Sequence, residues 1–286
     1  MISHARVSRN NHVIYLKMQQ AVPQATRKSK RLLELDQQDN NTAHPKKLCQ
    51  QERAHFRELW QAVCAHQTQK RIENITLSSD DLLRLRPGEW LNDEVINAYL
   101  HVLSHPYRQS QCVIDLANIK EDDQPTPLRL YAFSSFFYPA LEEGGHAKVA
   151  NWTVGIDLFE YHLIFVPCHV TGNHWCLAVI NVPLRRIDYY DSLYERAHCV
   201  NIKLLKQYMC LEHQKNRGDD DMEEEEWHWL SYEPRNTVPQ QNNASDCGVF
   251  LCQFASALAR QESVKTVKAS DMSFYRKKMV LDLLSY

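Results

Sequence analysis

The sequence predicts one α+β domain preceded by a flexible tail, on three observations. Apolar residues recur with helical spacing in several segments between residues 54 and 259. Three strand-length apolar segments lie close together between residues 162 and 190. Residues 1–52 are polar and basic without a sustained period, so they cannot bury enough apolar surface to fold. We therefore expect a tail over 1–52 and a folded domain over 53–286.

The composition argues against several classes of protein. The 286 residues are 44% hydrophobic with a formal net charge of −2, which argues against bulk nucleic acid as a partner. No apolar run approaches the ~18 residues that a membrane span needs, and residues 1–11 lack the apolar centre of a secretory signal. The nine cysteines form no C-x-x-C pair. We therefore expect reduced thiols, no metal site and no disulfide framework.

The tail contains a basic cluster, Arg27 to Arg31. Clusters of this kind serve as nuclear import signals, and an ordinary solvated tail is the equal alternative. We expect the protein in the nucleus, with the cytoplasm as the second location.

Three helices are predicted ahead of the strands. The first has apolar residues at helical spacing: Phe56, Leu59, Trp60 and Val63. The second has the same spacing over Val95, Ile96, Tyr99, Leu100 and Leu103, and Asn92 or Asp93 can cap its free backbone amides. Ser134 to Leu141 predicts the third, and residues 104–128, with three prolines, predict a long loop.

Three strands follow in a short meander: His162 to Val170, Trp175 to Val182 and Arg186 to Tyr190. The connection Thr171-Gly172-Asn173-His174 is of the hairpin type. Adjacent strands lie ~4.8 Å apart, so the first turn and the end of the third strand are close in space. We therefore expect His174 to come within reach of Asp191, which follows the third strand.

The rest of the chain predicts two helices and an acidic loop. Residues 201–211 predict a helix, and seven of the eight residues over 219–226 are acidic and predict a solvated loop. Cys247 to Ala259 has helical spacing with no breaker after Gly248.

Cys247 stands where a polar loop that starts at Pro239 meets this apolar helix. The unpaired amides and positive dipole at a helix start stabilise a thiolate. Gly248 is expected to leave the approach to the sulfur open. Taken alone, a cysteine in this place is also typical of a buried structural thiol.

Side chains suited to nucleophilic catalysis accompany this cysteine. His174 is the candidate base for Cys247, and Asp191 is the candidate that orients the imidazole. The Gln241 amide and the Cys247 backbone amide are candidate donors to the oxyanion of a tetrahedral intermediate. Each also has a structural interpretation: a turn histidine, a solvated strand-end aspartate and a loop glutamine.

Together these residues resemble the Ulp/SENP family of SUMO (sentrin)-specific cysteine proteases, from about Ile75 to the C-terminus. The order His, Asp, Gln, Cys matches that family, whereas papain-type enzymes put the cysteine first. The step of seventeen residues from His174 to Asp191 matches as well. Four blocks carry the resemblance: Trp90 to Asn97, Phe133 to Leu141, His174-Trp175 through Tyr189-Tyr190-Asp191-Ser192, and Pro239 to Phe250.

The resemblance implies a papain-like fold of two lobes, with a central antiparallel or mixed sheet flanked by helices and the active site between the lobes. It implies that Trp90 and Trp175 line a narrow channel for a Gly-Gly tail, with core packing as the plain alternative. Asn92 and Asp93 are expected to face the modifier or to cap their helix. No cofactor is implied.

The implied activity is hydrolysis of the peptide or isopeptide bond after the C-terminal Gly-Gly of SUMO, by a Cys-His-Asp triad in a monomer. SUMO or SUMO-conjugated proteins are the implied partners. Asn151 stands where the family usually has a basic residue, and segments 104–128 and 213–230 look long for the family. These departures motivate the same chemistry on another ubiquitin-like modifier.

Two further alternatives remain. One is a non-catalytic SUMO-binding protein that kept the groove. The other is acyl transfer, as in the related acetyltransferases, which the twin tryptophans fit poorly.

Overall fold

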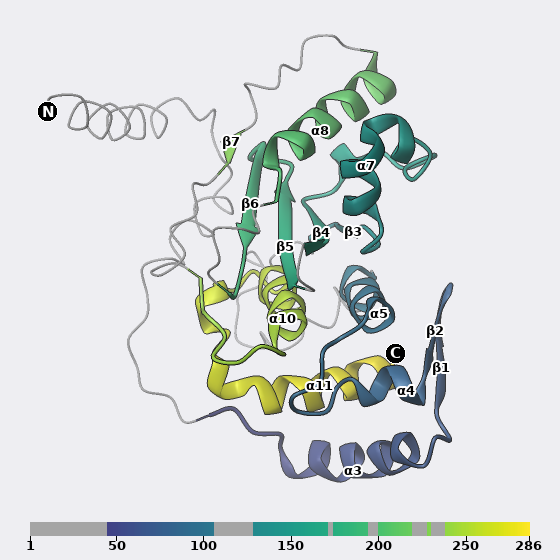
Figure 1. Cartoon of the computed structure of the whole chain (residues 1–286), viewed down its shortest axis with the longest axis vertical. Coiled ribbons are helices and arrows are strands. Elements are labelled where there is room, and N and C mark those ends of the chain that lie inside the picture. The colour runs from purple at the N-terminus through teal and green to yellow at the C-terminus, as the bar shows by residue number, and fades with distance from the viewer. Residues whose placement is uncertain (1–44, 106–127, 171–173, 194–199, 219–227, 230–237) are drawn as a thin grey trace, which may run out of the picture. The chain divides into compact units, whose positions relative to one another are not determined.

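The computed structural model describes residues 45–105, 128–170, 174–193, 200–218, 228–229 and 238–286 (Figure 1). Contacts along the chain separate residues 1–41 from residues 42–286. Most of the predicted tail, its basic cluster, nearly all of the loop over 104–128 and the acidic loop over 219–226 lie outside the described residues. Within the described ranges, no helix has the length and hydropathy to cross a membrane.

A mixed five-stranded sheet in the order β3-β4-β5-β6-β7 lies at the centre of the fold. The middle strands β4, β5 and β6 are antiparallel neighbours, which confirms the predicted meander. The edge strand β3 pairs in parallel with β4, and the edge strand β7 pairs in parallel with β6. The strand bounds are β3 Leu130–Ala132, β4 Leu163–Val170, β5 His174–Asn181, β6 Arg186–Tyr190 and β7 His228–Trp229. Helices around a mixed sheet confirm the predicted α+β class.

The sheet packs on both faces, and all eight residues of β5 are buried. Leu177 and Val179 face one hydrophobic core, to which α5, α10 and α11 contribute. Ala178 and Ile180 face a second core with α7 and α8. Figure 1 shows the two sets of helices on opposite sides of the sheet. The bounds are α5 Asp93–Ser104, α7 Phe137–Val149, α8 Ile202–Arg217, α10 Cys247–Ala259 and α11 Met272–Leu284.

The predicted helices are present, with some shifted ends. α3 spans Gln50–Cys64, and α10 has the predicted bounds. α7 begins three residues later than predicted, because the Ser135 amide donates to Asn97 Oδ1 (2.8 Å) instead of entering a helix. α8 extends to Arg217, beyond its predicted end at residue 211.

Several elements were not predicted from the sequence: β1 Gln69–Ile72, β2 Ile75–Ser78, α4 Ser79–Leu83, α11, and the short 3-10 helices η4 Leu158–Glu160, η6 Val264–Thr266 and η7 Ala269–Asp271. Ahead of α3, the Lys46 amide donates to Asp271 Oδ1 (3.0 Å) and Leu48 is buried. The end of the tail at residue 52 stays a prediction.

Candidate active site

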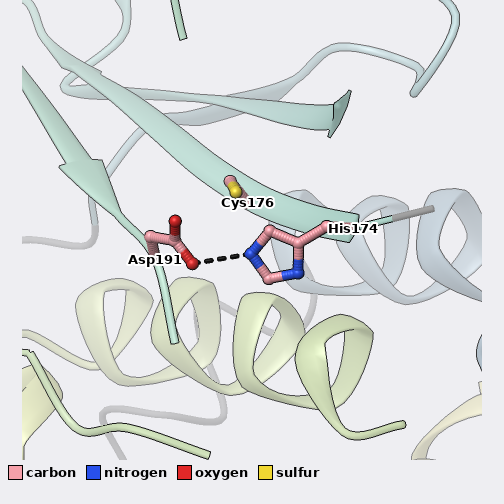
Figure 2. Close-up of side chains that lie close together, drawn as sticks. All are labelled: His174, Cys176 and Asp191. Atoms are coloured by element: carbon pink, nitrogen blue, oxygen red, sulfur yellow. Dashed lines mark hydrogen bonds and ion pairs between the residues drawn. The ribbon is translucent and has the colours of Figure 1, made fainter. Parts of the chain in front are cut away.

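His174 and Asp191 meet at one end of the sheet (Figure 2). His174 is the first residue of β5, and Asp191 directly follows β6. Because these strands are adjacent and antiparallel, His174 Nε2–H donates to Asp191 Oδ1 at 2.6 Å. The predicted proximity is therefore confirmed. His174 lies in the strand, paired with Val170, and not in the turn as predicted.

Asp191 is held by more than the histidine. The Leu193 amide donates to Oδ1 at 2.8 Å, and the Tyr189 hydroxyl donates to Oδ2 at 3.3 Å. The carboxylate is only 3% exposed. These donors fix the carboxylate, so it can fix the plane of the imidazole in turn. Asp191 is therefore a buried, hydrogen-bonded residue, not a solvated one.

The environment of His174 favours its charged form. Burial of the ring is the largest single influence and opposes protonation, but the hydrogen bond with Asp191 and those with the Cys176 and Cys247 thiols together outweigh it. Together they raise the pKa of His174 from 6.5 to about 12. These interactions therefore favour the imidazolium form of His174, and its role as the base for Cys247 stays a prediction.

Cys247 is the first residue of α10, as predicted, and it is 3% exposed. The Phe250 amide closes the first turn on the Asp246 carbonyl at 2.9 Å. The helix packs against β5, and this packing brings its N-terminus to the His174 ring. The thiol thus lies beside the His174 ring at the start of a helix.

Gly248 is required by packing on one side of this helix. A Cβ at this position would lie 3.0 Å from Leu91 Cβ and 3.4 Å from Ile96 Cδ1. The glycine therefore permits the close approach of α10 to Leu91. The sequence analysis expected Gly248 to leave the approach to the sulfur open. Its Cβ position instead faces Leu91 and Ile96.

The two tryptophans differ in their surroundings. Trp175 is 4% exposed, lies 4.4 Å from the His169 ring, and donates from Nε1 to the Leu91 carbonyl at 3.2 Å. Trp90 is 42% exposed. Leu91 directly follows Trp90, accepts the Trp175 hydrogen bond through its carbonyl, and packs against Gly248 through its side chain. Trp175 has a packing role, whereas the Trp90 surface is available to a ligand.

Gln241 is tied to the segment after Asp191. Its backbone N–H donates to the Ser192 carbonyl at 2.7 Å, and its side-chain Oε1 accepts from Ser192 Oγ at 2.8 Å. Its Nε2 donates to the Asn243 carbonyl at 2.5 Å. The structure therefore anchors the loop before Cys247 to the residues that follow the catalytic aspartate candidate.

Asn92 and Asp93 both make intramolecular contacts. Asn92 Oδ1 accepts from the Val95 amide at 3.3 Å, which makes it the N-cap of α5, and its Nδ2 donates to Asp81 Oδ1 at 2.7 Å. Asp93 Oδ1 accepts from Ser135 Oγ at 2.7 Å. Of the two predicted roles, capping is present for Asn92.

Cys176 is a neighbour that the sequence analysis missed, although its place two residues after His174 in a strand puts both on one face. Its sulfur and the ligand atoms of His174 and Asp191 lie within 4.8 Å of one another, which is close enough to hold a metal ion (Figure 2). Burial, however, raises the pKa of the Cys176 thiol to about 11. Metal ligation requires the thiolate. At neutral pH these three residues are therefore better described as a protonated Cys176 thiol beside the His174–Asp191 pair than as a metal site.

Comparisons with known sequences identify the family of the chain. Residues 89–285 match the family described as the Ulp1 protease family, C-terminal catalytic domain. Sentrin-specific protease 2 of Mus musculus is 35% identical over 210 residues, which are 73% of this chain and 32% of that protein. The sentrin-specific protease of Caenorhabditis elegans is 34% identical over 212 residues, 74% of this chain and 27% of that protein. The chain therefore spans about a third of the length of these curated relatives.

Solved structures share the fold. The C-terminal Ulp1 protease domain in complex with Smt3, the yeast ortholog of SUMO, superposes with a TM-score of 0.64 at 21% identity, covering 85% of this chain and 98% of that one. The catalytic domain of the Chaetomium thermophilum Ulp1-like SUMO protease gives 0.63 at 22% identity, covering 85% and 92%. This likeness confirms the predicted protease fold.

Proposed function

The chain belongs to the Ulp1 protease family, and from that premise we propose that it is a SUMO-specific cysteine protease. The proposed reaction is hydrolysis of the peptide or isopeptide bond after the modifier's C-terminal Gly-Gly. The observation that carries the proposal is the His174–Asp191 hydrogen bond of 2.6 Å beside a cysteine at the start of α10.

Acylation uses an ion pair between Cys247 and His174. The thiolate attacks the carbonyl carbon of the terminal glycine, and the electron pair of the C=O bond moves to oxygen. The Cys247 backbone amide and one N–H of Gln241 Nε2 donate to that oxyanion, a stabilisation typically worth ~10²–10³ in rate per donor. His174 then gives its proton to the leaving amine, which is a lysine side chain in deconjugation.

Hydrolysis of the thioester completes the cycle. Neutral His174 takes a proton from water, and the resulting hydroxide attacks the acyl carbon. The thiolate leaves while His174 is again the imidazolium. Asp191 keeps the ring in one orientation through both steps. No cofactor enters the scheme.

The tryptophans suit an unbranched substrate tail. Trp90 offers an exposed indole surface, and Trp175 donates to the carbonyl of the next residue, Leu91. We expect a Gly-Gly tail to cross Trp90, because glycine has no side chain to keep the backbone away from the indole. Asn92 and Asp93 follow directly and are the candidates to face the body of the modifier, with capping of α5 as the alternative for Asn92.

The identity of the modifier and the setting are part of the proposal. The Ulp1 protease domain, which shares this fold, was solved in complex with the yeast ortholog of SUMO, and this supports SUMO or a SUMO conjugate as partner. The exposed Asn151 supports the alternative, another ubiquitin-like modifier with a less acidic surface. We also propose a monomer located in the nucleus, with the cytoplasm as the second location.

The experiment is a reaction with SUMO that carries a thiol-trapping group at its C-terminal glycine, beside the same ubiquitin reagent. We expect an adduct with SUMO alone, located on Cys247 by mass spectrometry. Cys247→Ser should abolish the adduct, and Cys176→Ser, which removes the neighbouring thiol, should retain it.

Reaction with ubiquitin in place of SUMO would reassign the modifier. An adduct that persists in Cys247→Ser would refute the nucleophile. A tight complex with SUMO, without adduct or turnover, would support the non-catalytic binding protein instead.

A further inference from the structure

Arg276 is a buried cation in α11 that none of the steps above uses. It is 2% exposed, and its guanidinium is fully engaged. Nε and Nη2 both donate to Asp246 Oδ1, at 3.1 and 2.6 Å. The remaining donors reach backbone carbonyls at 2.8 to 3.2 Å: those of Arg84, Arg86, Glu89 and Ser245.

These acceptors belong to two segments that are far apart in the sequence. Arg84, Arg86 and Glu89 lie in the turn directly before Trp90 and Leu91. Ser245 and Asp246 directly precede Cys247. One side chain from a third segment thus joins the stretch that carries Trp90 to the stretch that carries the nucleophile.

The contact continues from Asp246 into the loop of the oxyanion candidate. Asp246 Oδ2 accepts from Asn243 Nδ2 at 2.7 Å, and the Asn243 carbonyl accepts from Gln241 Nε2 at 2.5 Å. The Arg276 guanidinium therefore connects, through one carboxylate and one asparagine, to the side chain proposed to hold the oxyanion.

The guanidinium is suited to this place in a way that an ammonium is not. It presents five N–H donors in a rigid plane, whereas lysine offers three donors from one point. Only the planar group can hold acceptors along several of its edges at fixed separation. A lysine at this position keeps the charge but loses most of the carbonyl contacts.

We propose that Arg276 is a positioning residue of the active site, which holds the Trp90 segment and the Cys247 segment in one arrangement. The inference rests on the proposed protease function for its kinetic consequence. A displacement of ~1 Å between catalytic groups can lower a rate by ~10²-fold. We therefore expect Arg276→Lys to lower kcat/KM on a SUMO–fluorophore fusion by ~10²-fold.

The test separates positioning from folding and from the choice of substrate. Arg276→Lys and Asp246→Asn are compared with Lys277→Ala, an exposed neighbour on the same helix. The folded, active fraction is counted with the SUMO thiol-trapping reagent, and kcat is expressed per titrated site. Separately, the rate at which iodoacetamide alkylates Cys247 is measured against pH by mass spectrometry, without any SUMO.

We expect both variants to lose kcat per titrated site and to alkylate Cys247 with a changed pH profile, while Lys277→Ala matches the wild type. A loss of stability alone leaves kcat per titrated site unchanged. Wild-type kcat and a wild-type alkylation profile in both variants would overturn the inference. If Arg276→Lys does not fold, Asp246→Asn decides by the same criteria. If no protein cleaves SUMO but the alkylation profiles differ, the modifier is wrong and the positioning role stands.

Discussion

The two halves of the active site are held in place by different kinds of contact. His174 and Asp191 are 17 residues apart and lie on adjacent strands, so the register of β5 and β6 brings them together. Cys247 and Trp90 meet through Arg276, whose bonds to the Trp90 segment span 187 to 192 residues. The first half needs only a correct meander, whereas the second needs three distant segments to pack. Damage to the first half should therefore stop the chemistry, and damage to the second should affect stability and rate together.

The largest expected effect comes from breaking the first half at Asp191. Asp191→Asn keeps the shape of the side chain but removes the carboxylate that orients His174 and stabilises its protonated form. The equivalent change in a serine protease triad lowers kcat by ~10⁴. We expect a loss on the order of 10³ on a SUMO–fluorophore substrate, against no loss for the exposed Asp80→Asn. Retained activity would show that His174 needs no orienting partner.

The same variant gives a pH test of the pair. Asp191 raises the folded-state pKa of His174 above its unfolded value of 6.5, so the pair stabilises the protein fully below pH 6.5. This contribution is lost as the pH rises through the folded-state pKa. The difference in the free energy of unfolding between wild type and Asp191→Asn should therefore shrink from about pH 6.5 upward, as measured by urea unfolding. A difference that grows with pH would contradict the assignment.

A smaller effect is expected from Gly248→Ala, which tests the second half. The new Cβ lies 3.0 Å from Leu91 Cβ, so α10 or the Trp90 segment must shift. Overpacking of this kind costs about 1–3 kcal/mol in the free energy of unfolding, and the shift should lower kcat about tenfold. Gly144→Ala is the control for kcat, because its Cβ would lie 2.7 Å from Lys148 Cβ, so it introduces a close contact that does not involve Leu91, and kcat should stay at the wild-type value. Equal behaviour of the two variants would mean that the Leu91 contact has no role in positioning.

Asn92 offers a finer test between capping and substrate contact. Asn92→Ala removes the cap of α5 and should cost about 1 kcal/mol in unfolding free energy. Asn92→Asp restores an N-cap of similar strength and should recover stability. We expect KM for the SUMO substrate to stay the same in both. A raised KM in a stable Asn92→Asp would instead assign this side chain to the modifier.

The smallest effect on catalysis is expected on the opposite face of the sheet. Glu212 is fully buried in α8 and accepts from Thr153 Oγ1 at 2.5 Å and from His146 Nε2 at 2.7 Å. Glu212→Gln should cost about 1–3 kcal/mol of stability, measured by urea unfolding, because a buried acceptor is replaced by a donor. The value of kcat/KM should not change. A loss of activity at wild-type stability would show that the two faces are coupled.

Sequence patterns were sufficient for the elements whose signals are local. Strand-length apolar segments and a hairpin-type connection located β4, β5 and β6, and an apolar run after a polar loop located α10 to the residue. The proximity of His174 and Asp191 followed from strand spacing alone. Cys247, His174 and Asp191 could therefore be named as candidates from the sequence, and their catalytic roles stay a prediction.

Other features depend on contacts that no local pattern contains. The helix α11 was not predicted, because the charged Arg276 lies on its buried face and interrupts the apolar pattern, although most of the buried residues have helical spacing. The late start of α7 depends on the Asn97–Ser135 bond between distant segments. The cap formed by Asn92 and the close approach of Gly248 to Leu91 were likewise open questions until side chains were placed.

The position of Arg276 in the chain has a consequence for biosynthesis. Every residue of the proposed chemistry is translated before α11, yet the guanidinium that joins their segments arrives with that helix. A nascent chain on the ribosome therefore holds its thiol, imidazole and carboxylate without the connection between them. Full activity should appear only after α11 has left the exit tunnel and docked, which is later than the synthesis of the residues proposed for the chemistry.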